Sequence, residues 1–264
     1  MKKYLVIGNP IEHSLSPKLH NFWMKKNNIN AIYEKEKILD SDLKDLIAKV
    51  QKGEISGINV TVPFKKKVID YLDQLSIGSK ITQSVNTISL NGKNLIGYNT
   101  DIDGFELAIK NINFNVLNKK ILILGAGGVV SSIIFALKKL KAQQIIVSNR
   151  TKEKAENLKK LFKDIEIINW GNVPDFDLII NATSVGLKKD DKISLDLSKI
   201  NKGKFFYDVI YNPKETNFLK EAKKLGNEIE NGKKMFIYQA AAAFELWHKI
   251  KPEIDENVNA LLDD

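Results

Sequence analysis

The stretch "ILILGAGGVV", residues 121–130, constrains the fold of this chain more than any other part of it. Its first four residues form an apolar run typical of a buried parallel strand, and helical spacing follows the glycines. This order is typical of dinucleotide-binding folds, in which Gly125 would permit the tight turn and Gly127 the close approach of a pyrophosphate. Val130 holds the third position, where Gly or Ala is usual. We predict a Rossmann-type domain, with an ordinary strand-to-helix turn as the alternative.

Arg150 is the only arginine among 41 basic residues, and it stands at the end of the next predicted strand, in "VSNRTKEK". NAD-binding folds normally place an acidic residue here, about 20 residues after the glycines, to bond the ribose hydroxyls. In this chain the strand ends in Asn149, Arg150 and Thr151, and Lys152 and Lys154 follow. A guanidinium binds phosphate through a planar fork and stacks on adenine, so the sequence predicts NADP rather than NAD. An ordinary surface base at Arg150 is the alternative.

The composition fits a soluble globular chain with one large or two ordinary domains. The 264 residues are 43% hydrophobic and 28% charged, and no apolar run approaches the roughly 20 residues of a membrane helix. The opening segment lacks the apolar length of a signal peptide, so we expect a cytoplasmic protein. With no cysteine and three scattered histidines, we expect no disulfide and no metal site. The net charge of +9 comes from dispersed lysines, which favours a solvated surface over nucleic-acid binding and would attract anionic substrates.

The order of predicted elements indicates an α/β chain with two units. In the first third, strand-like and helical patterns alternate, which predicts a mostly parallel sheet. Asn91-Gly92 between two alternating segments predicts a hairpin turn. A helix is expected from about Asp101, and a second α/β series begins at "KKILILGAGG". We therefore expect a first domain over residues 1–101 and a dinucleotide-binding domain over residues 102–236.

Two serines precede the first predicted helix, in "EHSLSP". Pro17 suits the first helical position, which makes Ser16 the expected N-cap. Ser14 has no such structural role, and its hydroxyl is therefore a candidate for binding.

Lys65 and Asp101 are the candidates for proton transfer. In "NVTVPFKK", Pro63 ends a predicted strand and Lys65 falls in the first turn of a predicted helix. The helix dipole would disfavour the charged form of Lys65, which suits a base that must be neutral near pH 7. In "NTDIDG", Asp101 shares the expected helix start with Thr100 and Asp103, which leaves one acid free for other work.

These motifs occur together and in order in one known family. Nearly the whole chain resembles the shikimate dehydrogenases, from "GNPIEHSLSP" through "NVTVPFK", "VNT", "NTDIDG", "GAGG", "NRT" and "NATSVG" to "DVIYNPKET" and "NGKKMFIYQAAAAFELW". The resemblance implies an NADP-dependent enzyme that interconverts 3-dehydroshikimate and shikimate in aromatic amino-acid biosynthesis. It also implies that the helices of residues 237–264 return to the first domain, with a hinge that closes the cleft.

The same resemblance implies a role for each matching residue. On the substrate side, Ser14, Ser16 and Tyr211 would hold the carboxylate, Thr61, Asn86 and Gln239 would bond the ring hydroxyls, and Lys65 and Asp101 would form the catalytic pair. On the cofactor side, Gly125, Ala126, Gly127, Gly128 and Val129 would take the pyrophosphate, and Asn149, Arg150, Thr151 and Lys154 the adenosine phosphate. Thr183, Ile210 and Gly232 would line the path towards nicotinamide.

The residue types support part of this assignment and leave alternatives. Gln239 lies on an apolar helical line, where a polar amide needs a partner that neighbouring backbone could also supply. Tyr211 follows a strand at the edge where open α/β sheets bind ligands, although a tyrosine there also serves packing. Asn59, Asn86 and Asn99 end or interrupt strands, and turn chemistry is their ordinary explanation.

Other functions stay open at this point. A relative that also oxidises quinate, or one that prefers NAD, would share these motifs, and only the missing acid after "VSNR" argues against NAD. A non-catalytic NADPH-binding regulator would share the fold. The presence together of Lys65, Asp101, Ser14 and Gln239 disfavours it, because a sensor needs no hydroxyl-binding groups. We expect a small-molecule substrate and neither nucleic acid nor membrane as partner, and a homodimer is left open.

Overall fold

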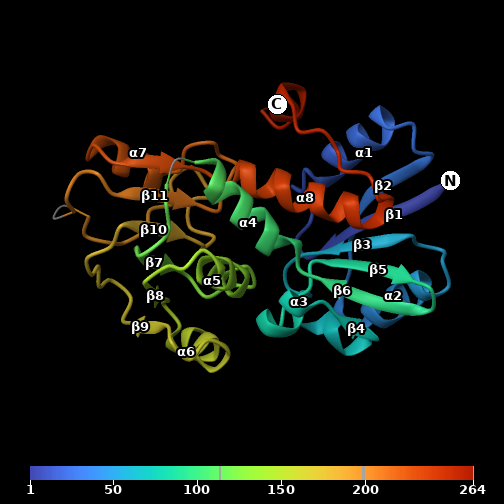
Figure 1. Cartoon of the computed structure of the whole chain (residues 1–264), viewed down its shortest axis with the longest axis horizontal. Coiled ribbons are helices and arrows are strands. Elements are labelled where there is room, and N and C mark those ends of the chain that lie inside the picture. The colour runs from blue at the N-terminus through green and yellow to red at the C-terminus, as the bar shows by residue number, and fades with distance from the viewer. Residues whose placement is uncertain (113, 198–199, 264) are drawn as a thin grey trace. The chain divides into compact units, whose positions relative to one another are not determined.

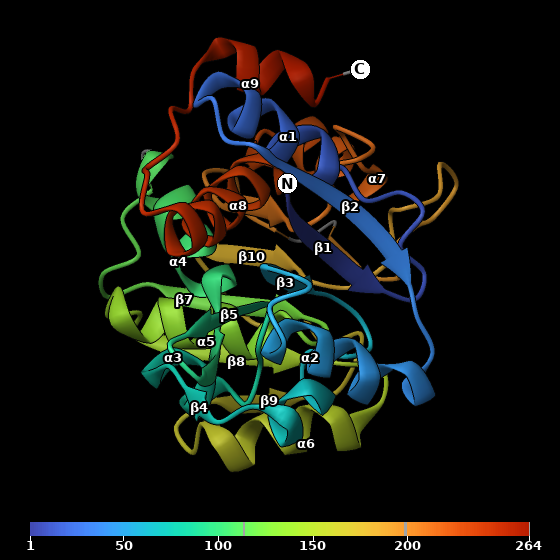
Figure 2. The same ribbon diagram turned by 90° about the vertical axis from the view of Figure 1, so that its right-hand side faces the viewer.

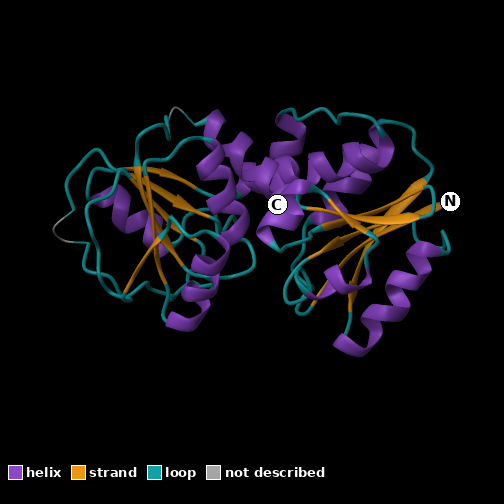
Figure 3. Cartoon of the chain, turned by 60° about the horizontal axis from the view of Figure 1, so that its bottom comes forward, coloured by secondary structure: helices purple, strands orange, loops and turns teal. Residues whose placement is uncertain are grey.

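The computed structural model describes residues 1–112, 114–197 and 200–263, and the chain divides into two units (Figure 1). Unit 1 comprises Met1–Gly104 and Ile237–Asp264, and unit 2 comprises Phe105–Phe236. Each unit is built on its own six-stranded sheet, flanked by helices (Figure 3). None of the helices in the described ranges has the length and apolar character needed to cross a membrane.

Unit 1 contains a mixed sheet in the strand order β2-β1-β3-β5-β6-β4. Its elements are β1 (Lys2–Gly8), α1 (Ser16–Lys26), β2 (Ala31–Lys37), η1 (Asp40–Asp42), α2 (Leu43–Gln51), β3 (Gly57–Val60), η2 (Lys67–Tyr71), β4 (Gln74–Leu75), α3 (Ile77–Thr82), β5 (Thr87–Asn91), β6 (Asn94–Tyr98) and α9 (Glu256–Leu261). β1, β2 and β3 run parallel, as β4 does to β6, whereas β5 is antiparallel to β3 and β6. The hairpin predicted at Asn91-Gly92 joins β5 and β6 and is confirmed.

Alternating side chains give the sheet of unit 1 two apolar faces. Leu5 and Ile7 of β1 pack in one cluster with the buried face of α2. Tyr4 belongs to the opposite face, where its ring lies 4.9 Å from that of Trp247 on α8 (Lys233–His248). On this side α9 lies next to α1 (Figure 2), and the indole of Trp23 in α1 donates a hydrogen bond to the Glu253 carbonyl at 3.0 Å. Segments that follow unit 2 in the sequence thus complete the core of unit 1.

Unit 2 contains a parallel sheet in the order β12-β11-β10-β7-β8-β9. Its elements are β7 (Lys120–Leu124), α5 (Val130–Lys139), β8 (Gln144–Ser148), α6 (Lys152–Leu161), β9 (Glu166–Ile168), β10 (Leu178–Asn181), β11 (Phe205–Asp208), α7 (Asn217–Lys224) and β12 (Glu228–Glu230). The direction of strand succession reverses between β7 and β10, as in Rossmann folds, which bind ligands at the carboxyl edge of that point. The predicted fold class, α/β with a Rossmann-type unit, is confirmed.

Two helices carry the chain between the units, α4 (Thr100–Asn111) and α8. The helix predicted from about Asp101 is therefore confirmed as α4. Phe105 of α4 packs edge-on against Tyr207 of β11, with ring centroids 5.5 Å apart. The neighbouring Phe206 points to the other face, which α7 covers through Phe218 and Leu219.

The helix predicted to hold Lys65 is wrong. Lys65 lies in a turn, and a short 3-10 helix, η2, begins only at Lys67. The Lys65 carbonyl accepts the Val85 N–H at 2.8 Å instead of the Ile69 N–H that an α-helix would supply. The argument from a helix dipole therefore does not apply to Lys65.

Candidate functional site

Lys65 and Asp101 form an ion pair in unit 1, with Nζ and Oδ2 2.5 Å apart. The backbone of Lys65 is fixed by the hydrogen bond from the Val85 N–H to the Lys65 carbonyl, and Asp101 stands in the first turn of α4. The two side chains expose only 14% and 8% of their surface, so water and salt screen the pair weakly. The fold thus brings together an acid and a base that are 36 positions apart in sequence.

Asn86 and Gln239 complete a polar cluster around this pair. The Asn86 amide, just before β5, donates to Asp101 Oδ1 at 3.1 Å and to Gln239 Oε1 at 3.3 Å. Gln239 comes from α8, and its predicted need for a partner on an apolar helix is met here. Lys65, Asn86, Asp101 and Gln239 are therefore assembled within one unit.

Ser14 and Ser16 lie together at the start of α1, but their roles differ from expectation. α1 begins at Ser16, whose N–H donates to Ser14 Oγ at 3.3 Å. The predicted N-cap at Ser16 is thus wrong, because Ser14 supplies the oxygen instead. Ser16 is buried.

Thr61 follows β3 and donates its backbone N–H to the Ile7 carbonyl at 2.9 Å. Its methyl group packs on Gly8, where an added Cβ would lie 2.5 Å from it. In the part of the chain that the structure describes, neither Ser14 nor Thr61 hydrogen-bonds to the Lys65–Asp101 pair.

Sequence reasoning missed the residues that surround Asn86. Asn59 was interpreted as a turn residue, yet it lies inside β3, directly opposite Thr87 of β5. Tyr33 and Thr87 were not singled out at all, although both are buried and bonded to Asn59. The available signal was a polar residue within an apolar strand, because such a group must find a partner when buried.

The glycine-rich turn of unit 2 has the geometry of an anion cradle. Gly125 adopts φ +111°, and a Cβ there would lie 2.8 Å from the Ala182 carbonyl oxygen, so glycine is required. Next to it, α5 begins at Val130 with neither a side-chain cap nor an acidic residue in its first turn. An uncapped helix N-terminus offers N–H groups and positive potential to a phosphate.

Arg150 is exposed after β8 and makes no ion pair with any described residue. Beside it, the Asn149 amide donates to the Thr151 carbonyl at 2.7 Å, and Thr151 precedes α6. The strand itself ends in the buried Ser148 rather than in a carboxylate. The end of β8 therefore fits a phosphate better than a pair of ribose hydroxyls.

A buried carboxylate, Asp208, fixes the ends of β10 and β11. It accepts hydrogen bonds from the Asn181 amide at 3.1 Å and from the Ile210 N–H at 2.9 Å, while burial raises the pKa of Asp208. The Thr183 hydroxyl donates to Asn181 Oδ1 at 2.7 Å. Thr183 and Ile210 are thus held at the carboxyl edge of the parallel sheet.

Tyr211 follows β11 and Gly232 follows β12, both in unit 2. A Cβ on Gly232 would lie 1.9 Å from the Val209 carbonyl oxygen, so only glycine fits. The Tyr211 ring stacks on Phe236 with centroids 4.7 Å apart, and burial raises the pKa of Tyr211 to about 12. Packing is therefore one role of Tyr211, and its predicted contact with a carboxylate stays a prediction.

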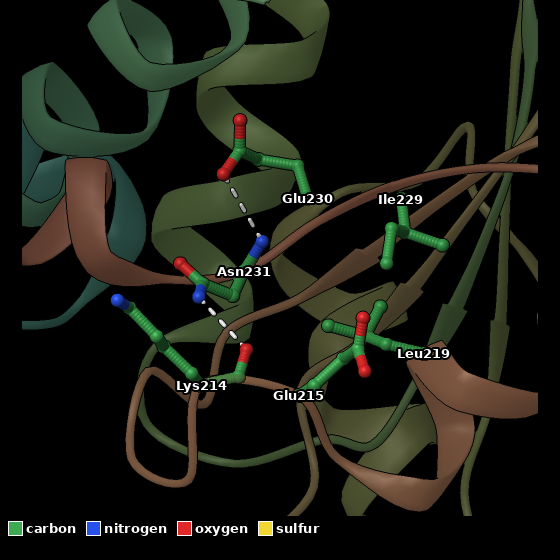
Figure 4. Close-up of a pocket in the computed structure, with 6 residues that line it drawn as sticks. All are labelled: Lys214, Glu215, Leu219, Ile229, Glu230 and Asn231. Atoms are coloured by element: carbon green, nitrogen blue, oxygen red, sulfur yellow. Dashed lines mark hydrogen bonds between the residues drawn. The ribbon is translucent and has the colours of Figure 1, made fainter. Parts of the chain in front are cut away.

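A hollow of about 450 Å³ opens beside β12 (Figure 4). It is lined by Lys214, Glu215, Leu219, Ile229, Glu230 and Asn231. The Asn231 amide donates to the Lys214 carbonyl at 2.9 Å across it. None of the predicted site residues lines this hollow, although Gly232 is the next residue in the sequence after Asn231, which does.

The whole chain is similar to known enzymes. Family models match at residues 6–88 (shikimate dehydrogenase substrate binding domain), 106–213 (shikimate / quinate 5-dehydrogenase) and 234–262 (shikimate 5'-dehydrogenase C-terminal domain). A shikimate dehydrogenase (NADP(+)) of Pelagibacter ubique is 60% identical over 262 residues, which are 99% of each chain.

Two solved structures extend the comparison to the fold. A shikimate dehydrogenase in complex with NADP+ is 36% identical, with a TM-score of 0.94 over 100% of this chain and 95% of that one. The shikimate 5-dehydrogenase of Thermus thermophilus, in complex with NADP(H) and shikimate, is 30% identical, with a TM-score of 0.91 over 100% and 99%.

The parallel sheet and its glycine turn have the arrangement of a Rossmann-type unit, and the family matches place the chain among the oxidoreductases. With full-length identity at this level, the chain belongs to the shikimate dehydrogenase family. The expected family and enzyme class are thereby confirmed, and the expected NADP cofactor agrees with the names of these relatives.

Proposed function

We propose that this chain interconverts 3-dehydroshikimate and shikimate with NADP(H), using Lys65 and Asp101 as its catalytic pair. The observation that carries the proposal is the shielded Lys65–Asp101 ion pair, with Nζ 2.5 Å from Oδ2, in a chain of this family. A bound NADPH supplies hydride to the carbonyl carbon of the substrate and becomes NADP+. Lys65 gives the proton that the carbonyl oxygen needs, and takes it back in the reverse reaction.

Asp101 orients this proton transfer. Its Oδ2 holds the Lys65 ammonium and its Oδ1 accepts the Asn86 amide, so the carboxylate is fixed from both sides. Asn86 and Gln239, which belong to the same cluster, would bond ring hydroxyls through their amide groups. Thr61 would bond a ring hydroxyl as well. Ser14, Ser16 and Tyr211 would hold the substrate carboxylate. A group held this firmly needs little reorganisation when the substrate reacts.

The cofactor would bind on unit 2. The pyrophosphate would lie on residues 125–129 at the start of α5, and Asn149, Arg150, Thr151 and Lys154 would take the adenosine phosphate. Thr183, Ile210 and Gly232 would line the nicotinamide end. The uncapped helix and the unpaired Arg150 support this arrangement. Residues 1–101 with 237–264 would then be the substrate-binding domain, and 102–236 the NADP-binding domain.

The test is to follow the absorbance of reduced nicotinamide with shikimate and NADP, and in parallel with NAD and with quinate. Reduction of NADP by shikimate, with much slower reduction of NAD, is the expected result. An enzyme that turns over NAD equally well would overturn the role of Arg150. A protein that binds NADPH but reacts with neither substrate would be a regulator instead.

Quinate is the second candidate substrate. The central family model describes shikimate and quinate 5-dehydrogenases together, which is the observation that favours it. The quinate arm of the same assay decides between a single and a dual specificity.

A further inference from the structure

A buried chain of hydrogen bonds runs from Tyr33 towards the catalytic pair. The Tyr33 hydroxyl donates to Asn59 Oδ1 at 2.6 Å, and Tyr33 is only 1% exposed. Burial raises the pKa of Tyr33 well above its ordinary value, so its hydroxyl keeps its proton at any working pH. The side chain is held by stacking on His20, with the rings 4.2 Å apart and nearly parallel.

The donated proton fixes the next amide in the chain. Because Asn59 Oδ1 is the acceptor for Tyr33, Asn59 must present its Nδ2 on the other side. Nδ2 donates to the Asn86 carbonyl at 3.0 Å and to Thr87 Oγ1 at 2.9 Å. The Thr87 hydroxyl, which accepts this bond, donates its own proton to Asn86 Oδ1 at 3.1 Å.

The orientation of the Asn86 amide follows from these donors. Its Oδ1 accepts from Thr87 Oγ1 and also from the Thr100 N–H at 2.7 Å. Its Nδ2 is thereby turned to Asp101 Oδ1 at 3.1 Å. The reversed amide would place a carbonyl oxygen against the Asp101 carboxylate, which repels it.

We propose that Tyr33, Asn59 and Thr87 are positioning residues that orient the Asn86 amide, and through it the Asp101 carboxylate, for proton transfer. This inference rests on the proposed function, because the three residues would position the proposed catalytic pair, Lys65 and Asp101. None of the three needs to touch the substrate. Together with Asn86, these three residues form a relay of hydrogen bonds that ends at Asp101.

The test compares Thr87→Val with Thr87→Ser in the shikimate–NADP assay. Valine keeps the shape of threonine and removes the hydroxyl, whereas serine keeps the hydroxyl. We expect Thr87→Val to lower kcat about tenfold, the size of one lost hydrogen bond to a fixed group, and to leave the KM for NADP unchanged. Thr87→Ser should restore most of the rate.

Tyr33→Phe tests the far end of the relay. It should lower kcat and leave the KM for NADP unchanged, and the double variant with Thr87→Val should be no slower than the slower single variant. Thermal melting of each variant separates loss of positioning from loss of folding. Additive effects, or a fall in kcat of the same size in Thr87→Ser as in Thr87→Val, would show a merely structural role and overturn the proposal.

Asp101→Asn tests the catalytic pair separately from the relay. If Asp101→Asn is inactive and Thr87→Val is as fast as wild type, the relay does not position Asp101, whereas the catalytic role of the pair is supported. If Asp101→Asn turns over normally, the catalytic pair itself is wrong, and the relay falls with it.

Discussion

The indole of Trp247 occupies the space beside the backbone of Gly57, where a Cβ would lie 2.4 Å from its Nε1. The same nitrogen donates to the Ile88 carbonyl at 3.1 Å, so the ring is held and cannot easily give way. The contact locks α8 onto β3 and β5 of unit 1.

Gly57→Ala should therefore destabilise unit 1. We expect a loss of about 1–3 kcal/mol in the free energy of unfolding, because overpacking forces the indole or the strand to shift. Urea denaturation measures this loss. Combining the change with Trp247→Phe should cost less than the sum of the two single changes, and strict additivity would mean that the two residues do not compete for space.

Lys65→Ala should lower kcat far more than it changes the KM for either substrate. The expected fall is about 10²–10⁴-fold, the usual contribution of a positioned proton donor. Lys67→Ala is the matched control, since Lys67 is a neighbouring exposed lysine that pairs with Asp40 on the surface. Near-normal turnover of the Lys65 variant would remove Lys65 from the mechanism.

Arg150→Ala should raise the KM for NADP about 10–100-fold and leave kcat nearly unchanged, because a charged hydrogen bond to phosphate contributes to binding only. The KM of Arg150→Lys for NADP should lie between those of the wild type and Arg150→Ala, since an ammonium lacks the planar fork of a guanidinium. Lys163→Ala, an exposed lysine just after α6, serves as control. An unchanged KM would make Arg150 an ordinary surface base.

His20 should make the protein sensitive to acid. It is fully buried, its two ring nitrogens have no hydrogen-bond partner among the described residues, and burial, aided by His248, lowers its pKa from 6.5 to about 3. Below pH 6.5 the unfolded chain therefore binds a proton at His20 that the folded chain does not bind. The contribution of His20 to stability is fully present above pH 6.5 and falls by about 1.4 kcal/mol per pH unit as the pH drops towards about 3.

His20→Phe keeps an aromatic ring against Tyr33 and should flatten this acid slope. The free energy of unfolding, measured by urea titration at several pH values, provides the check. His13→Gln, at an exposed histidine, should keep the wild-type slope. An equal slope in the His20 variant would assign the acid sensitivity to other groups.

Local chemistry made part of the fold predictable from the sequence. The Asn91-Gly92 hairpin and the apolar run before Gly125 depend on turn preference and strand burial, which short stretches encode. The helix at Lys65 was mispredicted because its carbonyl is taken by Val85, a partner 20 positions away that no local pattern reveals. Long-range pairing had overridden helical spacing.

For the candidate site, single residues could be predicted from the sequence, but most of their long-range partners could not. Gln239 stood out because an amide on an apolar helix needs a partner, although the partner, Asn86, could not be named from spacing. Asn59 and Thr87 were missed because their contact depends on the register between two antiparallel strands. Ser16 was predicted as the N-cap, whereas the N-cap of α1 is Leu15, an error of one residue at a helix end.

The discontinuity of unit 1 has a consequence for the order in which the chain folds during synthesis. Unit 2 is one continuous segment and can fold as soon as Phe236 has left the ribosome. The sheet of unit 1 is made first, yet Trp247 and Phe244, which cover one of its faces, are made after all of unit 2. During synthesis, the sheet of unit 1 therefore keeps one apolar face exposed until the whole of unit 2 has been made.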